Sequence, residues 1–197
     1  MPEGQLEDIP RSILIQASRG DTQAFEIIYR AASDFVYRTA FRITNNSDDA
    51  EDVTQDVFIK VYQNLKNFQF RSSFKTWVYR ITVNTALSTC KGKGIGRGTG
   101  KETSRRNDDV TVMDRRVSSV VEIDVDKKDN EKLVASLLRM LNPDQRACIV
   151  LREIEGLNYQ EIAEVLSINI NTVRSRLKRA RETLLAYKNS EVIPNGV

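Results

Sequence analysis

The sequence predicts an all-α protein built from two small helical domains that are joined by a flexible linker. Apolar residues recur at helical spacing up to about residue 91 and again from about residue 131. The run between them, residues 92–130, is charged and contains five glycines and three serines, which is typical of a linker. In the last third of the chain, two helix starts lie close enough together for a helix-turn-helix.

Composition restricts the class of protein. The 197 residues suit one or two small domains, and a net charge of only +3 means that any affinity for nucleic acid must come from local basic patches. The chain has no histidine, which excludes catalytic triads, zinc sites and proton relays built on imidazole. Cys90 and Cys148 are far apart, so we expect two reduced thiols and no metal cluster or disulfide framework. Without a signal peptide or a long apolar run, we expect a cytoplasmic protein that makes no membrane contact of its own.

The first domain, residues 1–91, begins with two predicted helices. A short helix runs from about Ser12 to Arg19 and ends at Gly20. Asp21 then caps a long helix that ends at Asn45. One face of the long helix is largely apolar and carries Phe25, Ile28, Ala32, Phe35 and Ile43.

An acidic amphipathic helix is predicted from Asp48 to Leu65. Valine recurs every fourth residue on its inner face, and acids crowd its first turn, where the helix dipole favours them. Dipole and capping explain these first acids, but they do not require the polar face that continues through Asp52, Gln55 and Asp56. Two interpretations remain open, a solvated helix start and a surface that docks another protein.

The stretch from Phe68 to Lys91 is basic and aromatic and contains no acid. Ser72 or Ser73 starts a helix there. The residues expected on its inner side are Trp77, Ile81 and Leu87. Aromatic residues at helical spacing are commonly core residues. They also suit single-stranded nucleic acid, because rings stack on unpaired bases while Arg and Lys follow the backbone.

The glycine-rich part of the linker does not form a phosphate-binding loop. Residues 91–101 hold five of the nine glycines of the chain. A P-loop requires a glycine six positions before Lys101 and a serine or threonine after it, where this chain has Ile95 and Glu102. No strand precedes the glycines, which also excludes a dinucleotide fingerprint. We therefore expect no cofactor.

The second domain, residues 131–197, is predicted to contain four helices. The first helix stops at Asn142, which caps a second helix that begins with Pro143. This second helix ends at Gly156. Its inner residues are predicted to be Ala147, Val150, Leu151 and Ile154.

The last two helices form the predicted helix-turn-helix. Asn158 and Glu161 form a capping box for a helix over about 159–166, and the final helix covers about 170–187. Val173, Leu177, Ala180 and Leu184 give the final helix a buried stripe, and its other faces are strongly basic. The first exposed residues can reach base edges or phosphates in a major groove, and they are Asn171, Thr172, Arg174 and Ser175.

Three motifs in this order resemble the small two-domain sigma factors of bacterial RNA polymerase, the extracytoplasmic-function (ECF) group. They are DAEDVTQDVFIKVY, FKTWVYRITVN, and NYQEIAEVL followed by NTVRSRLKRARE. The resemblance covers roughly residues 20–91 and 131–187. It implies a transcription initiation factor that is not an enzyme. The implied partners are the RNA polymerase core, promoter DNA and an anti-sigma protein.

The resemblance also implies roles for individual residues. The acidic helix would dock on the clamp helices of the largest core subunit through Asp52, Gln55 and Asp56. The aromatic helix would capture the melted −10 element, and the matching residues are Trp77, Arg80 and Asn84. The last helix would read the −35 duplex, and the matching residues are Arg174, Ser175, Lys178 and Arg179.

The chain departs from the family pattern at two places. In the loop before the aromatic helix, Phe70 and Arg71 stand where the family often has a glycine and an acid, so a −10 base preference does not carry over. In the helix-turn-helix, Ser167 replaces the common glycine of the turn.

A conventional helix-turn-helix regulator, with a ligand-sensing or dimer-forming N-terminal half, is the alternative. Such a regulator binds specific duplex DNA by itself, whereas a sigma factor binds weakly until the core polymerase joins it. The acidic helix and the acid-free aromatic helix favour the sigma factor, because a repressor needs neither.

Overall fold

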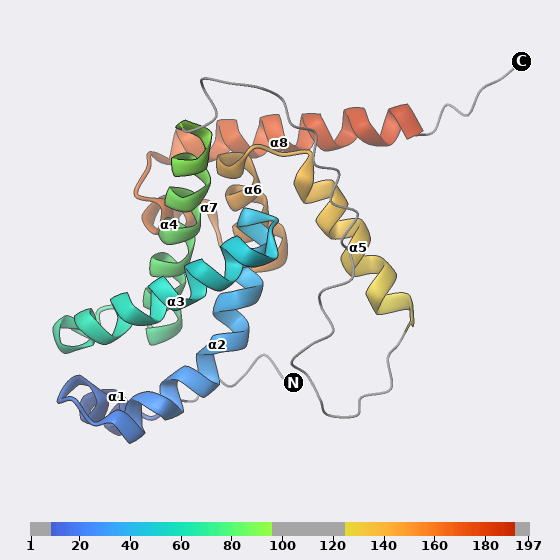
Figure 1. Cartoon of the computed structure of the whole chain (residues 1–197). Coiled ribbons are helices and arrows are strands. Elements are labelled where there is room, and N and C mark those ends of the chain that lie inside the picture. The colour runs from blue at the N-terminus through green and yellow to red at the C-terminus, as the bar shows by residue number, and fades with distance from the viewer. Residues whose placement is uncertain (1–8, 96–124, 192–197) are drawn as a thin grey trace, which may run out of the picture.

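The regular elements of the chain are helices throughout the part that the structure describes (Figure 1). This structure is a computed structural model, and it describes residues 9–95 and 125–191. The all-α prediction is confirmed. The N-terminal region holds α1 (Arg11–Ser18), α2 (Thr22–Thr44), α3 (Ser47–Asn64) and α4 (Phe74–Ile95), with a 3-10 turn at Leu65–Asn67. The C-terminal region holds α5 (Val125–Arg139), α6 (Pro143–Ile149), a π-helical turn (Val150–Ile154), α7 (Tyr159–Leu166) and α8 (Ile170–Glu191).

The predicted linker, residues 92–130, lies mostly outside the described residues. Within its described ends, α4 continues to Ile95 and α5 already begins at Val125. The two helices therefore extend into the stretch that composition alone assigned to the linker.

Side-chain caps define the helix starts of the N-terminal region. The Asp21 carboxylate accepts hydrogen bonds from the amides of Gln23 and Ala24, at 2.9 and 3.1 Å, and so begins α2. The side chain of Asn46 accepts from the amide of Asp49 at 2.9 Å and begins α3. Because these bonds satisfy amides that have no partner inside the helix, each helix starts at one defined residue.

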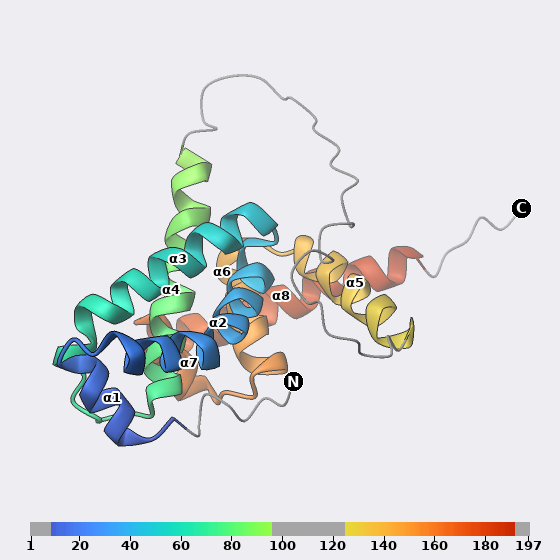
Figure 2. The ribbon, with the colours of Figure 1, turned by 60° about the horizontal axis from the view of Figure 1, so that its bottom comes forward.

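Three helices enclose the core of the N-terminal region. α2, α3 and α4 pack on one another, and α1 packs on α2 (Figure 2). The side chains that face inward from the three long helices are fully buried. They include Ile28, Val36, Ile43, Val53, Val57, Val61, Val78 and Val83. The valines that repeat every fourth residue of α3 thus form its inner face, as the sequence predicts.

The second helix of the C-terminal region departs from the predicted register. It starts at the predicted capping box, in which Asn142 accepts from the amide of Gln145 at 2.9 Å. After Ile149 the backbone widens into the π-helical turn, closed by a bond from the amide of Glu155 to the carbonyl of Val150 at 3.1 Å. The turn rotates the residues that follow, so Ile154 is 37% exposed instead of lying on the inner side. The helix ends at Gly156, whose φ of +73° favours glycine.

The two regions contact each other. α6 lies against α2 and α4, and α7 lies against α4 (Figure 1). Their buried apolar side chains belong to one cluster. Arg146 of α6 is 7% exposed, and its guanidinium donates to the carbonyl of Ile43 at the end of α2, at 2.7 Å.

Candidate nucleic-acid interface

The helix-turn-helix is built as its sequence predicts. In the capping box of α7, Asn158 accepts from the amide of Glu161 at 3.0 Å, and the Glu161 carboxylate accepts from the amide of Asn158 at 2.7 Å. α7 ends at Ser167, which has a left-handed backbone with φ of 53°. The side chain of Asn169 then accepts from the amide of Asn171 at 2.8 Å as α8 begins. Ser167 thus makes the turn where the family commonly has glycine.

One side of α8 is buried and the other is basic and exposed. Val173, Leu177 and Ala180 are buried, which holds the helix against the rest of the C-terminal region. Five of the six predicted −35 residues are exposed, and these are Asn171, Arg174, Ser175, Lys178 and Arg179. Thr172 is half-buried, and its carbonyl accepts from the Ser175 hydroxyl at 2.9 Å.

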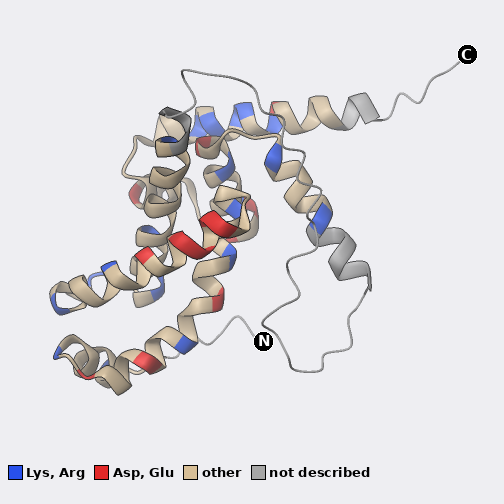
Figure 3. Cartoon of the chain, in the orientation of Figure 1, with Lys and Arg blue, Asp and Glu red and all other residues tan. Residues whose placement is uncertain are grey.

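The exposed face of α8 is rich in hydrogen-bond donors. The Arg174 guanidinium is oriented by a 3.0 Å bond to the side-chain oxygen of Asn171. Lys178 forms an ion pair with Glu182 at 3.8 Å on the exposed surface. Figure 3 shows Lys and Arg along α8, whereas the acids concentrate on α3. An arginine that is oriented by a neighbouring side chain and still exposed can donate hydrogen bonds to guanine edges and to phosphates.

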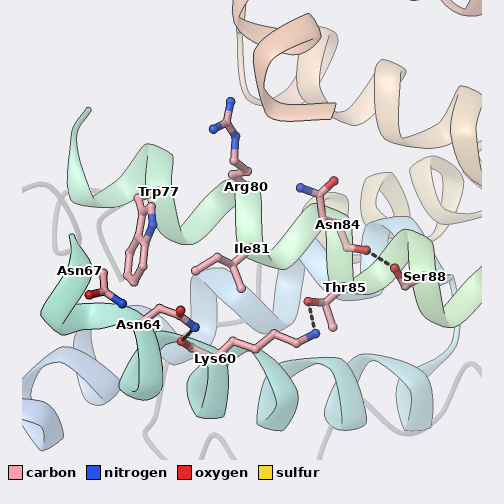
Figure 4. Close-up of a pocket in the computed structure, with 9 residues that line it drawn as sticks. All are labelled: Lys60, Asn64, Asn67, Trp77, Arg80, Ile81, Asn84, Thr85 and Ser88. Carbon is pink, nitrogen blue, oxygen red and sulfur yellow. Dashed lines mark hydrogen bonds between the residues drawn. The ribbon is translucent and has the colours of Figure 1, made fainter. Parts of the chain in front are cut away.

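A groove of about 450 Å³ runs between α3 and α4 (Figure 4). Its lining residues are Lys60, Asn64, Asn67, Trp77, Arg80, Ile81, Asn84, Thr85 and Ser88. The lining contains two cations and no acid, so an anionic ligand meets no opposing carboxylate there. The predicted −10 residues Trp77, Arg80 and Asn84 all belong to it.

Aromatic packing fixes one end of this groove. The Trp77 ring lies 5.0 Å from that of Phe68 and 5.8 Å from that of Phe74, measured between centroids. Trp77 is half-buried, so one part of the indole anchors the start of α4 while another part lines the groove. A ring held in this way loses little conformational freedom when a base stacks on it.

Six of the nine lining residues were not predicted as site residues, and three of these six come from outside α4. Lys60, Asn64 and Asn67 come from α3 and the 3-10 turn, and Lys60 donates to the Thr85 hydroxyl of α4 at 2.9 Å (Figure 4). Lys60 and Asn64 are four residues apart, a spacing that places them on one helix face. The four-residue spacing could have predicted that Lys60 and Asn64 act together. It could not have predicted that α4 lies opposite them.

The loop before α4 contains a strained residue. Phe70 has φ of 56°, a conformation that a bulky side chain rarely adopts. Its ring lies 4.8 Å from that of Phe68, and the Arg11 guanidinium lies 4.3 Å from its centroid. This is the position at which the family often has glycine, so the unusual backbone is present here although the glycine is not.

The predicted docking face of α3 is exposed. Asp52, Gln55 and Asp56 are all exposed and lie on the outer side of the helix, opposite the buried valines. Asp49 is instead 7% exposed and belongs to the start of the helix. The acids of α3 therefore fall into two groups, those of the helix start and those of the exposed face.

The two cysteines lie near the contact between the regions. Cys148 is buried, and burial raises the pKa of its thiol to about 11. Cys90 is half-buried, and its thiol lies 3.9 Å from the carbonyl of Ile43. Among the described residues, no group of three His, Cys, Asp or Glu side chains is arranged to hold a metal ion. No helix in residues 9–95 and 125–191 is both long enough and apolar enough to cross a bilayer.

Two family models match the chain. The Sigma-70 region 2 family matches residues 28–94, which carry the groove and the acidic face. The Sigma-70 region 4 family matches residues 131–184, which carry the helix-turn-helix.

Curated relatives match most of the chain. The RNA polymerase sigma-H factor of Pseudomonas aeruginosa is 34% identical over 186 residues, which is 88% of this chain and 91% of that protein. The ECF sigma factor SigE of Mycolicibacterium smegmatis is 34% identical over 183 residues, which is 91% of this chain and 68% of that protein. The ECF sigma-E factor of Escherichia coli K12 is 31% identical over 186 residues, which is 90% of this chain and 94% of that protein.

Two solved structures share the fold. The sigma factor RpoE of Bartonella quintana, in complex with the anti-sigma factor NepR, has 26% identity and a TM-score of 0.57 over 81% of this chain and 93% of its own. CnrH, in complex with the cytosolic domain of CnrY, has 24% identity and a TM-score of 0.60 over 93% of this chain and 99% of its own, and it supports the fold alone. With both sigma regions matched and relatives aligned over about nine-tenths of its length, the chain belongs to the ECF group of RNA polymerase sigma factors, which direct promoter-specific transcription initiation.

Proposed function

We propose that this sigma factor catalyses no reaction itself and acts through its binding surfaces. While it is bound to RNA polymerase core, it holds a promoter at two places. The observation that carries the proposal is the presence of two separate surfaces suited to DNA, the acid-free groove between α3 and α4 and the basic face of α8. A protein that contacts two promoter elements needs two such surfaces. A conventional regulator needs only the second.

The face of α8 is proposed to read the −35 duplex. Asn171, Arg174, Ser175, Lys178 and Arg179 are exposed on it, and Thr172 supports it from a half-buried position. A bidentate contact between arginine and guanine discriminates against a wrong base by about 1–3 kcal/mol. Arg174, near the start of the helix, is the residue proposed to make such a contact.

The groove between α3 and α4 is proposed to take the melted −10 strand. Trp77 offers a ring for stacking, Asn84 an amide for a base edge, and Arg80 and Lys60 positive charge for the backbone. Unpaired bases expose the faces and edges that these groups require, whereas a duplex buries them. Binding at this groove would therefore favour the open form of the promoter.

The partners follow from the family and from the exposed acids. Asp52, Gln55 and Asp56 are proposed to dock on the clamp helices of the largest core subunit. The domain assignment follows, with residues 1–91 for the core and the −10 element and residues 131–197 for the −35 element. RpoE of Bartonella quintana is bound to an anti-sigma factor, which supports a similar partner for this chain. Since its target is the transcribing enzyme of a bacterial cell, we place its action in the cytoplasm.

The test separates the two DNA surfaces. Arg174→Ala should weaken binding to a −35 duplex and relax base preference there, while Asn84→Ala should leave duplex binding nearly unchanged and impair promoter opening. Both variants are assembled with core polymerase at one stated salt concentration, because phosphate contacts make affinity depend on salt. Duplex affinity and the permanganate reactivity of −10 thymines are the measurements. Arg30→Ala, on the exposed side of α2 away from both surfaces, controls for the loss of one positive charge.

Equal loss of duplex affinity in both variants, with normal opening by Asn84→Ala, would contradict the assignment. The chain would then use one DNA surface, as a conventional regulator does. A pre-melted −10 bubble should not fully rescue Asn84→Ala, because that variant is expected to lose capture of the exposed strand.

A further inference from the structure

A series of side-chain contacts joins the first helix of the chain to the −10 groove. The Arg11 guanidinium, at the start of α1, lies 4.3 Å from the centroid of the Phe70 ring. The Phe70 ring lies 4.8 Å from that of Phe68, and the Phe68 ring lies 5.0 Å from that of Trp77, which lines the groove. An arginine of α1 is thus linked through three rings to the groove between α3 and α4.

Phe70 is the member of this series that needs support. Its φ of 56° is a conformation that a bulky residue keeps only where the surrounding structure holds it. The Phe70 ring is 37% exposed, so the core encloses it only in part. A cation over an aromatic face is attracted to it, and the Arg11 guanidinium therefore stabilises the ring in the position that the strained backbone requires.

The segment around Phe70 forms one end of the groove. Asn67, three residues before Phe70, and Trp77, in the first turn of α4, both line the groove, and Figure 4 shows them at the same end. Phe68 lies between these segments, because its ring contacts those of Phe74 and Trp77. α1 also packs on the 3-10 turn that contains Asn67. A displacement of Phe70 would therefore reach, through Phe68, the ring on which an unpaired base is proposed to stack.

We propose that Arg11 is a positioning residue for capture of the −10 strand, which it serves by holding Phe70 and, through Phe68, the ring of Trp77. The proposal rests on the proposed role of the groove in −10 binding. α1 lies outside residues 28–94, the part of the chain that the Sigma-70 region 2 family matches. Arg11 does not touch the DNA in this arrangement. It keeps the segment and the ring ordered before the strand arrives, so that less conformational freedom is lost on binding.

A positioning arginine differs in two measurable ways from an arginine that binds a phosphate. A phosphate contact releases counterions, so its loss reduces the logarithmic dependence of single-strand affinity on salt by about 0.7, whereas the loss of a positioning residue leaves that slope unchanged. An arginine that acts through the Phe70 ring also has no effect once the ring is removed. A phosphate contact by Arg11 would not depend on Phe70, so the two effects would simply add.

The experiment uses the full-length chain assembled with core polymerase. Affinity is measured at several salt concentrations for a labelled single strand that carries the −10 sequence of a promoter identified by run-off transcription, and in parallel for a −35 duplex. Arg11→Ala should weaken strand binding roughly two- to fivefold, the size of an exposed cation–π contact, while the salt slope and the duplex affinity stay unchanged. Arg11→Lys keeps a cation and should give a smaller loss. Arg19→Ala, which removes an exposed arginine at the other end of α1, is the matched control and should change neither affinity.

Phe70→Gly provides the background that separates positioning from direct contact. Glycine adopts a φ of 56° without strain and offers no ring to the cation. Arg11→Ala should therefore cause no further loss of strand affinity in this background. An equal loss with and without the ring, or a lower salt slope in Arg11→Ala, would show that Arg11 contacts the DNA directly and would overturn the proposal.

The remaining outcomes also decide the question. If Arg11→Ala binds the strand as tightly as Arg19→Ala does, Arg11 does not position the groove. Loss of strand affinity and duplex affinity together would show a general effect on folding or on assembly with core, which would overturn the proposal as well. Trp77→Ala tests the groove itself. If that variant binds the strand like the wild type, the proposed −10 role of the groove is wrong and this inference fails with it, whereas a loss in Trp77→Ala without a loss in Arg11→Ala overturns this inference alone.

Discussion

Replacing Arg146 tests how strongly one buried cation stabilises the protein. The Arg146 side chain donates to three carbonyls, those of Leu138 at 2.8 Å, Ile43 at 2.7 Å and Leu141 at 2.9 Å. Burial lowers its pKa, but an arginine remains protonated at neutral pH. Hydrogen bonds to a charged group contribute about 1.5–3 kcal/mol each. Removing the cation also removes its desolvation cost, which is several kcal/mol. We therefore expect Arg146→Met, which keeps the length of the side chain, to lower the free energy of unfolding by about 2–4 kcal/mol, less than the sum of three bonds.

Urea denaturation followed by circular dichroism measures this loss. Arg139→Met, an exposed arginine at the end of α5, is the matched control and should change stability by less than about 0.5 kcal/mol. Arg146→Lys keeps the charge but not the planar arrangement of donors, and should fall between the other two variants. A loss for Arg146→Met no larger than that of the control would refute the reasoning, because three buried carbonyls would then have lost their donor at no cost.

Three further outcomes are expected. Asp52→Lys with Asp56→Lys should weaken co-purification with core polymerase while leaving helical content unchanged, since like charges at an interface cost several kcal/mol; undiminished co-purification would exclude this face as the docking surface. The pKa of the Cys148 thiol rises from 9.0 to about 11 by burial, so the stability that comes from keeping it neutral is present below pH 9 and is lost as pH rises through 11. Wild type should then lose up to about 2–3 kcal/mol more than Cys148→Ala in urea denaturation between pH 9 and 11, and parallel curves would contradict this. Ser167→Gly should stabilise the protein by about 0.5–1 kcal/mol in the same assay, because glycine removes the left-handed strain but adds freedom to the unfolded chain; a loss of stability would show that the serine side chain is needed at the turn.

Local signals in the sequence predicted the helix starts well. Asp21, Asn142 and Asn158 cap the helices that they were expected to cap, because each bonds amides only two or three residues away. The turn at Ser167 was also expected from the sequence, and α7 ends there. The inner faces of α3 and α8 followed from apolar spacing, which depends on one helix alone.

Features that depend on packing were not predictable in this way. Ile154 was expected to point inward, but the π-helical turn before it shifts the register, and apolar spacing assumes a regular helix. Lys60 and Asn64 join the groove because α3 lies against α4, and the bond from Lys60 to Thr85 joins residues 25 positions apart in the chain. Arg146 reaches Ile43 only because the two halves meet. The roles of the residues in DNA and core binding stay predictions until they are tested.

The order in which the helices are synthesised has a consequence for the cell. Within the N-terminal region, α1 to α4 follow one another in the chain and pack on one another, so most contacts of this region are complete once α4 has been made. α7 (Tyr159–Leu166) follows the end of α4 at Ile95 by about seventy residues, which a ribosome needs roughly 4–14 s to add. During those seconds, the nascent chain presents Arg80 and Asn84 without the carbonyls of Glu164 and Val165. A new molecule therefore presents Arg80 and Asn84 without the α7 carbonyls to which these side chains donate in the finished chain, until α7 has been made.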